Sequence, residues 1–344
     1  MIRTALGIIK AGLLKRPVPI YCHWEYTFRC NLACAFCTLQ SGPNVWTPET
    51  TTGQAAQLVD QLADLGTAII HFVGGEPTLR RDLGETAARA RSRGILTAVT
   101  SNGFVRESDL DALSKMQFIR ISLTGPYDRE DILGKKSKRL DPVATLEALL
   151  ETGAKPEIAS TFSAATTEED IQYVLNTARR LNTPIGLNFV GVGVSNLKGF
   201  TREDLQHRKD ELQPLLMDQG ETLTRLRKLI RNHADIVQNT EDFLDMVESG
   251  GLGRYGCRAM DTALSLKADG SVAMPCIEFA EKSQKGDLVS VFYGPEAQKV
   301  RKRQGREWYC KDCSLSCMYS SSRLLRLSSL PEMAKRYLRS VRLL

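Results

Sequence analysis

The chain has 344 residues, of which 42% are hydrophobic, and a formal net charge of +6. This length is sufficient for a large buried core and exceeds that of one ordinary domain. No run of about 18 apolar residues is present, which argues against a transmembrane helix, and the first residues lack the features of a secretory signal. Nine cysteines without an export signal favour a cytoplasmic protein that uses them for metal ligation. The modest charge comes without a nucleic-acid motif, so no nucleic-acid partner is expected.

Residues 1–17 predict a basic amphipathic helix, and residues 321–344 form a second basic segment with six basic residues and one acid. In the first segment apolar residues recur at helical spacing: Ile2, Leu6, Ile9 and Leu13. Such segments usually pack one face and expose the other. The alternative is peripheral contact with an anionic membrane surface.

Residues 18–200 alternate short apolar runs with helical patterns, which predicts parallel strands joined by crossover helices. Six strands are expected, at 19–26, 68–73, 95–100, 118–123, 157–162 and 184–190. Asp141 with Pro142 predicts one helix start, and Thr166 with Glu169 a capping box for the next helix. Residues 201–250 are rich in charge and helix formers and predict a helical linker. Periodicity alone does not separate a barrel from an open doubly wound sheet.

Three cysteines follow the first predicted strand, Cys30, Cys34 and Cys37, and no fourth cysteine lies nearby. A structural zinc needs four protein ligands, whereas an iron-sulfur cube held by three cysteines leaves one iron open. The spacing C-x3-C-x2-C, with aromatic Phe36 before the last cysteine, resembles the signature of the radical S-adenosyl-L-methionine (SAM) enzymes. The resemblance implies a partial (β/α)6 barrel, an α/β fold, and a 4Fe-4S cluster whose open iron chelates SAM. On reduction SAM is then cleaved to methionine and a 5'-deoxyadenosyl radical.

Later segments resemble the other motifs of this family, in the same order and at successive strand ends. Gly74–Pro77 resembles the turn that receives the SAM ammonium, for which Glu76 is the acidic acceptor. Ser101 and Asn102 resemble a ribose-contacting turn, Ser122 a ribose or carboxylate contact, and Val192 part of the segment against the adenine. Each alone is ordinary turn chemistry. Together they imply cofactor contacts from Phe36, Gly74, Gly75, Glu76, Pro77, Ser101, Asn102, Ser122 and Val192.

A second cysteine group lies in residues 251–320 and contains Cys257, Cys276, Cys310, Cys313 and Cys317. Asp269-Gly270 between two alternating runs predicts a hairpin that folds Cys276 back toward Cys257. The group resembles the SPASM or twitch extension of radical SAM enzymes, although the full SPASM pattern has seven cysteines. The resemblance implies one auxiliary 4Fe-4S cluster, held by Cys257, Cys276, Cys310 and Cys313, with Cys317 competing for the last place. A structural zinc site is the alternative.

The substrate is the least determined feature of the sequence, and no residue that acts on it is predicted. Only 29 residues precede Cys30, too few for the leader-peptide domain of many peptide-modifying relatives, so a small molecule or natural-product intermediate is preferred. A flavodoxin- or ferredoxin-type donor would supply electrons. The alternatives are a lipid- or isoprenoid-modifying enzyme at a membrane surface, a peptide side-chain maturase and, in another class, a non-catalytic metal-cluster scaffold.

Overall fold

The computed structural model describes Gly7 and residues 16–40, 48–126, 140–194, 200–216, 220–311, 313 and 315–323. The basic helix predicted at 1–17 and the tail at 321–344 lie almost wholly outside these residues, as does the side chain of Cys317. Within the described part, no helix has the length and hydrophobicity needed to cross a membrane.

The strands of the described residues are β1 (Tyr21–Thr27), β2 (Ile69–Gly74), β3 (Leu96–Ser101), β4 (Phe118–Ser122), β5 (Pro156–Phe162), β6 (Ile185–Phe189), β7 (Ala263–Leu266), β8 (Val272–Pro275) and β9 (Ala280–Gln284). The longer helices are α2 (Thr52–Leu65), α3 (Leu83–Ser92), α6 (Pro142–Glu151), α7 (Glu168–Leu181), α8 (Arg202–Leu212), α9 (Glu221–Asn232), α10 (Glu241–Glu248), α14 (Pro295–Arg303) and α15 (Ser316–Arg323). Shorter ones are α4 (Leu110–Ser114), α11 (Gly251–Tyr255), α12 (Ala259–Thr262) and α13 (Leu288–Tyr293), with 3-10 turns η1 (Thr38–Gln40), η2 (Pro77–Leu79), η3 (Glu107–Asp109) and η4 (Trp308–Cys310).

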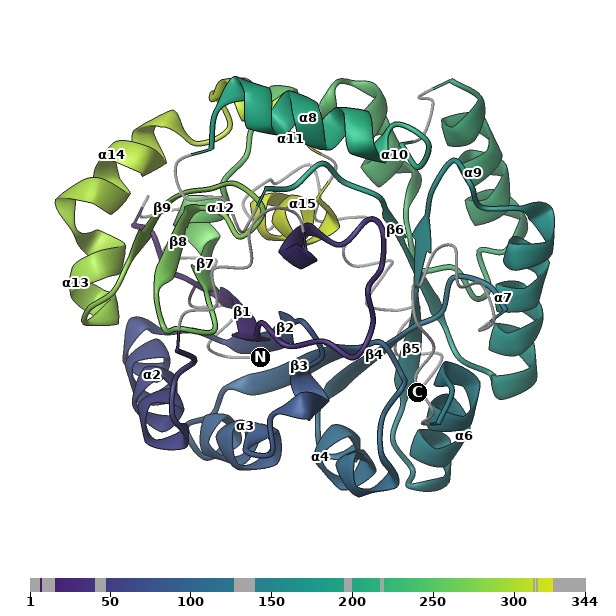
Figure 1. Cartoon of the computed structure of the whole chain (residues 1–344), viewed down its shortest axis with the longest axis horizontal. Helices are drawn as coiled ribbons and strands as arrows, with labels where there is room; N and C mark the ends of the chain where they lie inside the picture. Colours follow the sequence, from purple (N-terminus) through teal and green to yellow (C-terminus); the bar gives the residue numbers. More distant parts are fainter. Residues whose placement is uncertain are drawn as a thin grey trace.

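All nine described strands form one sheet in the order β6-β5-β4-β3-β2-β1-β7-β8-β9. Strands β1 to β6 are parallel neighbours, and helices α2, α3, α4, α6 and α7 lie along their outer side (Figure 1). This is the predicted partial six-stranded barrel, and each predicted strand is found within two residues of its expected ends. The fold follows from alternating strand and helix patterns, because parallel neighbours need a crossover connection.

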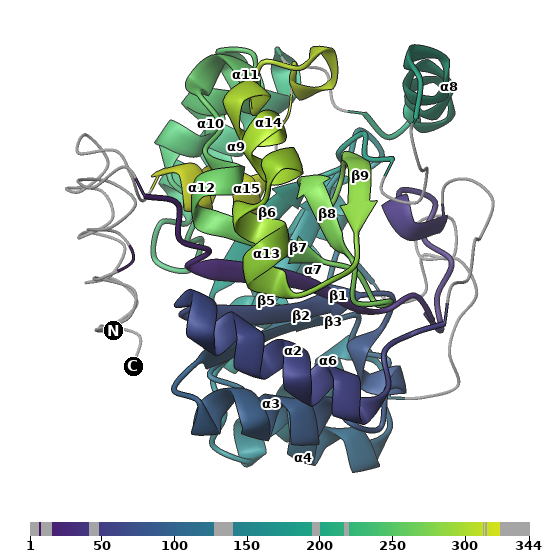
Figure 2. The same ribbon diagram turned by 90° about the vertical axis from the view of Figure 1, so that its left-hand side faces the viewer.

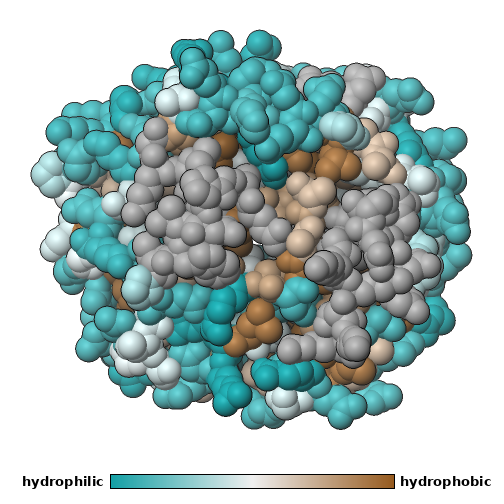
Figure 3. Space-filling view, viewed as in Figure 1, coloured by the Kyte–Doolittle hydropathy of each residue, from teal (hydrophilic) through white to brown (hydrophobic). Residues whose placement is uncertain are grey.

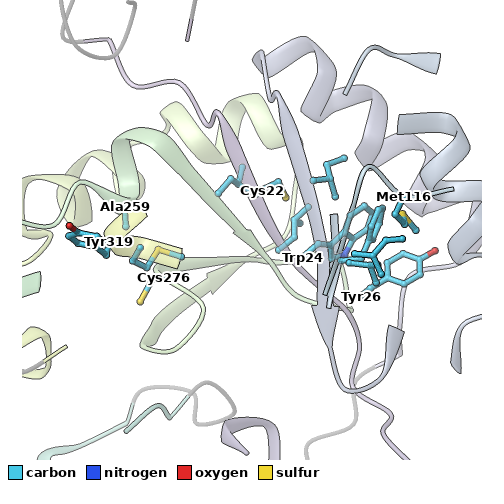
Figure 4. Close-up of a cluster of buried hydrophobic side chains, with 14 of the residues drawn as sticks. Cys22, Trp24, Tyr26, Met116, Ala259, Cys276 and Tyr319 are labelled. Atoms are coloured by element: carbon cyan, nitrogen blue, oxygen red, sulfur yellow. The ribbon is translucent and has the colours of Figure 1, made fainter. Parts of the chain in front are cut away.

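The alternation of side chains along β1 separates a helix-facing core from a polar barrel interior. Cys22, Trp24 and Tyr26 are buried on the helix side, where the Trp24 ring stacks on Phe72 of β2 at 5.8 Å between centroids (Figure 4). The Tyr26 hydroxyl bonds Thr86 Oγ1 of α3 at 2.7 Å. Cys22 is therefore a core residue, which is the usual role of an isolated buried cysteine.

Local capping signals explain where the helices begin. The Asp141 carboxylate accepts hydrogen bonds from the amides of Val143 and Ala144 at 2.9 Å, with Pro142 in the first turn, as predicted. The next capping box differs from the expected one, because α7 begins one residue later. Thr167 is the cap and Asp170 its partner, and the hydroxyl of Thr166 bonds the amide of Ser163 instead.

The hairpin predicted at Asp269-Gly270 is present and extends the barrel sheet. Strand β7 pairs in parallel with β1, while β8 and β9 are antiparallel (Figure 2). Gly270 has a φ of +79° and its amide donates to Lys267 O at 2.9 Å, the conformation that a glycine in a tight turn adopts without strain. The pairing of β7 with β1 brings the second cysteine group beside the strand that leads into the first.

Candidate functional site

The Gly-Gly turn at the end of β2 packs directly on the backbone that leads into the first cysteine group. The amide of Gly75 donates to Thr27 O and the amide of Glu76 to Arg29 O, both at 2.8 Å. A Cβ atom on Gly75 would lie 2.0 Å from Arg29 O. Gly74 has a φ of +122°, and its Cβ would lie 2.5 Å from Thr27 O. The two glycines are thus required by close backbone approach, which positions the cysteine loop.

The carboxylate of Glu76 joins the end of β2 to the end of β3. It is fully buried, and Oε1 accepts from the amide and hydroxyl of Thr78 at 3.1 and 2.8 Å and from Ser101 Oγ at 3.0 Å. Oε2 accepts from the amide of Asn102 at 2.7 Å. Burial raises the pKa of Glu76, and the bonds from Asn102 and Thr78 oppose that rise. The predicted ammonium contact of this carboxylate remains a prediction.

Asn102 links the predicted ribose turn to the cysteine loop. Its Nδ2 donates to Asn31 Oδ1 at 2.8 Å and to Cys30 Sγ at 3.8 Å, and its Oδ1 accepts from the amide of Phe104 at 2.9 Å. Asn31 Nδ2 in turn donates to Phe104 O at 2.8 Å. Asn31 was not singled out from the sequence, although its position beside Cys30 was a usable signal. The first two motifs and the ribose turn therefore form one hydrogen-bonded unit.

The three thiols of the first group lie within electrostatic reach of one another. Burial raises the pKa of Cys34 to about 12, and the neighbouring Cys37 and Cys30 raise it further in the same direction. Burial likewise raises the pKa of Cys30 to about 11, opposed by the amide of Leu32 and reinforced by Glu76 and Cys37. Thiolates this close would repel one another, and a bound metal centre would offset that repulsion, so the chemistry of this group fits a metal-cluster site.

Two of the other predicted contacts flank the cysteine loop and the turn. Phe36 is half-buried within the loop, and Pro77 is buried as the first residue of η2. Ser122 ends β4, half-buried and opposite Ala159 in register.

Among the described residues, no three His, Cys, Asp or Glu side chains are arranged to hold one metal ion.

The second cysteine group also assembles, from segments far apart in the chain. Burial raises the pKa of Cys276 well above its ordinary value, and nearby Cys313 and Cys257 raise it further. Burial raises the pKa of Cys310 to about 11, and Cys257 adds to this. A Cβ on Gly305 would lie 2.9 Å from the Cβ of Cys257, so a glycine is needed for this packing. Electrostatic interactions thus link the four thiols of the predicted auxiliary set, and Figure 4 shows Cys276 near Tyr319 of α15.

A polar network that sequence reasoning missed lies between the two cysteine groups. Glu25 of β1 is buried, with Oε2 at 3.7 Å from Lys267 Nζ. Burial raises the pKa of Glu25 to about 7, opposed by Lys267 and reinforced by Glu278. Buried Arg208 of α8 donates from Nη2 to Cys37 O at 3.2 Å. The acidic residue Glu25 inside the apolar segment of β1 is the sequence feature that could have indicated this network.

One cavity of about 480 Å³ lies where the end of β6, α8 and the second cysteine group meet. Its lining includes Val192 and Gly193 of the predicted adenine segment, Cys313 of the auxiliary set, and the rings of Trp308 and Tyr309. The carboxylate of Glu278 also faces it, because a Cβ on Gly193 would lie 1.9 Å from Glu278 Oε2. The cavity therefore touches elements of both predicted cofactor sites.

Comparison with known proteins identifies the family of this chain. The Radical SAM superfamily model matches residues 24–206, more than half of the chain. Fe-coproporphyrin III synthase of Methanosarcina barkeri is 35% identical over 120 residues, which are 34% of this chain and 29% of that protein. PqqA peptide cyclase of Rhizobium meliloti is 25% identical over 307 residues, 84% of this chain and 78% of the relative.

The fold is similar to that of a solved structure. Streptococcus suis SuiB bound to precursor peptide SuiA superposes with a TM-score of 0.59 at 18% identity, covering 93% of this chain and 73% of that one. With the cysteine spacing, the Gly-Gly turn and the six parallel strands in place, the chain belongs to the radical SAM superfamily of enzymes.

Proposed function

We propose that Cys30, Cys34 and Cys37 hold the family's 4Fe-4S cluster and that the turns at the ends of β2, β3 and β6 bind SAM. When bound, the cluster supplies the electron that cleaves SAM to methionine and a 5'-deoxyadenosyl radical. The chain's own part is positioning: the Gly-Gly turn holds the loop, and Glu76 fixes the ribose turn against it. The observation that carries this proposal is the hydrogen-bonded unit of Glu76, Asn102 and Cys30.

In this arrangement Glu76 has a second task, as an acceptor for the SAM ammonium. Hydrogen bonds to both of its oxygens hold the Glu76 carboxylate in a fixed orientation. Charge-assisted hydrogen bonds between a carboxylate and an ammonium are stronger than neutral ones. Asn102 Nδ2, which now donates to Asn31 and Cys30, also lies where it would hydrogen-bond a thiolate ligand. Hydrogen bonds to cluster sulfurs are one of the factors that set the reduction potential.

The second cysteine group is proposed to hold an auxiliary 4Fe-4S cluster through Cys257, Cys276, Cys310 and Cys313. The mutual influence of these thiols on their pKa values supports the ligand set. Since Cys313 lines the same cavity as Val192, such a cluster would be placed to accept an electron from a substrate radical. Structural zinc is the competing reading, and metal analysis separates the two.

A small-molecule or natural-product substrate is proposed for the cavity, with electrons from a flavodoxin- or ferredoxin-type donor. The volume of about 480 Å³ is in the range of small-molecule sites, and one relative is named for a coproporphyrin reaction. A peptide side chain is the second candidate, because PqqA peptide cyclase and SuiB with its precursor peptide act on or bind peptides. Membrane contact through the basic ends, with cytoplasmic residence, stays a prediction from the sequence.

The experiment is anaerobic reconstitution with iron and sulfide, reduction with dithionite and an assay for 5'-deoxyadenosine. The wild type is expected to form it, and a chain that forms none supports the alternative of a non-catalytic cluster scaffold. Candidate substrates are then compared by the transfer of deuterium from labelled substrate into 5'-deoxyadenosine. Deuterium transfer from a labelled peptide, and none from small molecules, would favour the maturase alternative.

A further inference from the structure

The cavity has an apolar wall and a basic rim. Its apolar lining includes Phe189, Val192, Leu205, Phe279, Trp308 and Leu315. Three cations also line it: Arg202 and Lys209 of α8, and Lys311, which follows η4. Figure 3 shows apolar side chains near the centre of the face in view, with mostly hydrophilic side chains toward its edge. A ligand that satisfies both parts of the lining has an apolar body and a negative group.

The three cations are available to a ligand. Arg202 and Lys311 are exposed and Lys209 is half-buried. Within the described part of the chain, none of the three forms an ion pair with a carboxylate. The Arg202 guanidinium instead lies 4.8 Å from the centre of the Trp308 ring, which joins the basic rim to the aromatic wall.

The acidic residue in the described lining, Glu278, does not neutralise this rim. Its side chain is hydrogen-bonded to Thr38, and the cations near it are Lys267 and Arg208 rather than the rim cations. Its carboxylate lies against the backbone of Gly193. The lining thus combines three cations, an apolar wall and one acid whose partners lie elsewhere.

We propose that this cavity binds a small amphiphilic organic anion, with its apolar body against Leu205, Phe279 and Trp308 and its carboxylate or phosphate between Arg202, Lys209 and Lys311. The cavity would serve as the substrate site of the proposed SAM-dependent reaction, on which this assignment rests. Apolar burial provides affinity, while a guanidinium and two ammonium groups select a negative group over a positive one. A ligand held there also contacts Cys313 and Gly193, and so lies between the two predicted cofactor sites.

The test measures binding of decanoate, decyl phosphate and decylamine to reconstituted enzyme by equilibrium dialysis, at concentrations below those at which they self-associate. The three probes share one apolar chain and differ in the head group. At least one anion is expected to bind about tenfold or more tightly than decylamine, the ratio that one charge-assisted hydrogen bond provides. Comparison of the two anions shows whether a carboxylate or a phosphate is preferred.

Variants test whether the anionic probes bind in this cavity. Lys209→Glu with Lys311→Glu should remove the preference for anions, whereas Lys302→Glu on α14, an exposed lysine that does not line the cavity, should retain it. Arg202→Gln, which adds no negative charge, should lower anion affinity about threefold to tenfold. A decanoate with a terminal diazirine should label the peptide that contains Trp308 on irradiation.

Equal or tighter binding of decylamine would overturn the assignment, as would anion binding unchanged in both cavity variants. The same wild-type preparation is assayed for 5'-deoxyadenosine. If SAM is cleaved while no anion preference is found, the substrate class is wrong and the proposed function stands. If SAM is not cleaved, the proposed function fails whatever the dialysis shows.

Discussion

Replacement of Glu76 by glutamine is predicted to loosen the link between β2 and β3. The two side chains have the same shape, but the amide places an NH2 group where a carboxylate oxygen now accepts. The backbone amides of Thr78 and Asn102 bond different oxygens of Glu76, at 3.1 and 2.7 Å. Whichever way the glutamine amide is turned, one of these buried N–H groups loses its acceptor. Such a loss costs about 2 kcal/mol.

Alanine at position 76 removes the acceptor for both amides and for the hydroxyls of Thr78 and Ser101. We therefore expect a loss of about 4 kcal/mol in the free energy of unfolding, roughly twice that of Glu76→Gln. The measurement is urea unfolding of the cluster-free chain under reducing conditions, followed by circular dichroism. Glu151→Gln on α6, an exposed acid, is the matched control and should change stability by less than about 0.5 kcal/mol.

The same variants test the role of this carboxylate in cofactor binding. Glu76→Ala should weaken SAM binding to the reconstituted enzyme by about 1.5 to 3 kcal/mol, the value of a charged hydrogen bond, while iron content is retained. Unfolding free energies equal to wild type in both variants would refute the anchoring role. Unchanged SAM affinity would show that the ammonium is bound by other groups.

Three further changes test the two cysteine groups and the Gly-Gly turn at the end of β2. Cys34→Ala should abolish 5'-deoxyadenosine formation, because a cube that loses one of three ligands falls apart or loses its potential, and full activity would exclude the assignment. The double variant with alanine at Cys257 and Cys276 should contain about four irons per chain instead of about eight, and it should still cleave SAM. A wild-type protein with about four irons and one zinc would exclude the auxiliary cluster. Gly75→Ala should reduce the iron incorporated on reconstitution, because the added methyl group collides with backbone, while Gly53→Ala, where nothing lies within 4 Å, should incorporate wild-type amounts.

The elements of the barrel could be read from the sequence because each depends on residues close together in the chain. Strand and helix periods, the Asp141 cap and the Asp269-Gly270 turn involve neighbours within a few positions. Where two neighbouring pairs offered the same spacing, local reasoning chose wrongly: the capping box uses Thr167 and Asp170 rather than Thr166 and Glu169. Both pairs satisfy the local pattern, but in the folded chain the Thr166 hydroxyl accepts from the amide of Ser163 instead.

The chemistry of the family was also present in the sequence. Three cysteines at C-x3-C-x2-C, followed by the Gly-Gly turn, were sufficient to indicate a radical SAM enzyme, and the family match agrees. The sequence did not show why Gly74 and Gly75 must be glycines. Their requirement comes from Thr27 and Arg29, more than forty residues earlier, which approach only after β1 and β2 pair.

Only the tertiary structure decided how the two cysteine groups relate and what lies between them. The parallel pairing of β7 with β1 joins residues more than 230 positions apart and brings Lys267 to within 3.7 Å of Glu25. The cavity likewise combines the end of β6, α8 and the segment around Trp308. Such contacts depend on how whole elements pack, and no local pattern encodes them. The sequence by itself therefore determined the elements, the cysteine motifs and the family, while the partners of Glu76, the polar network and the basic rim of the cavity required the folded chain.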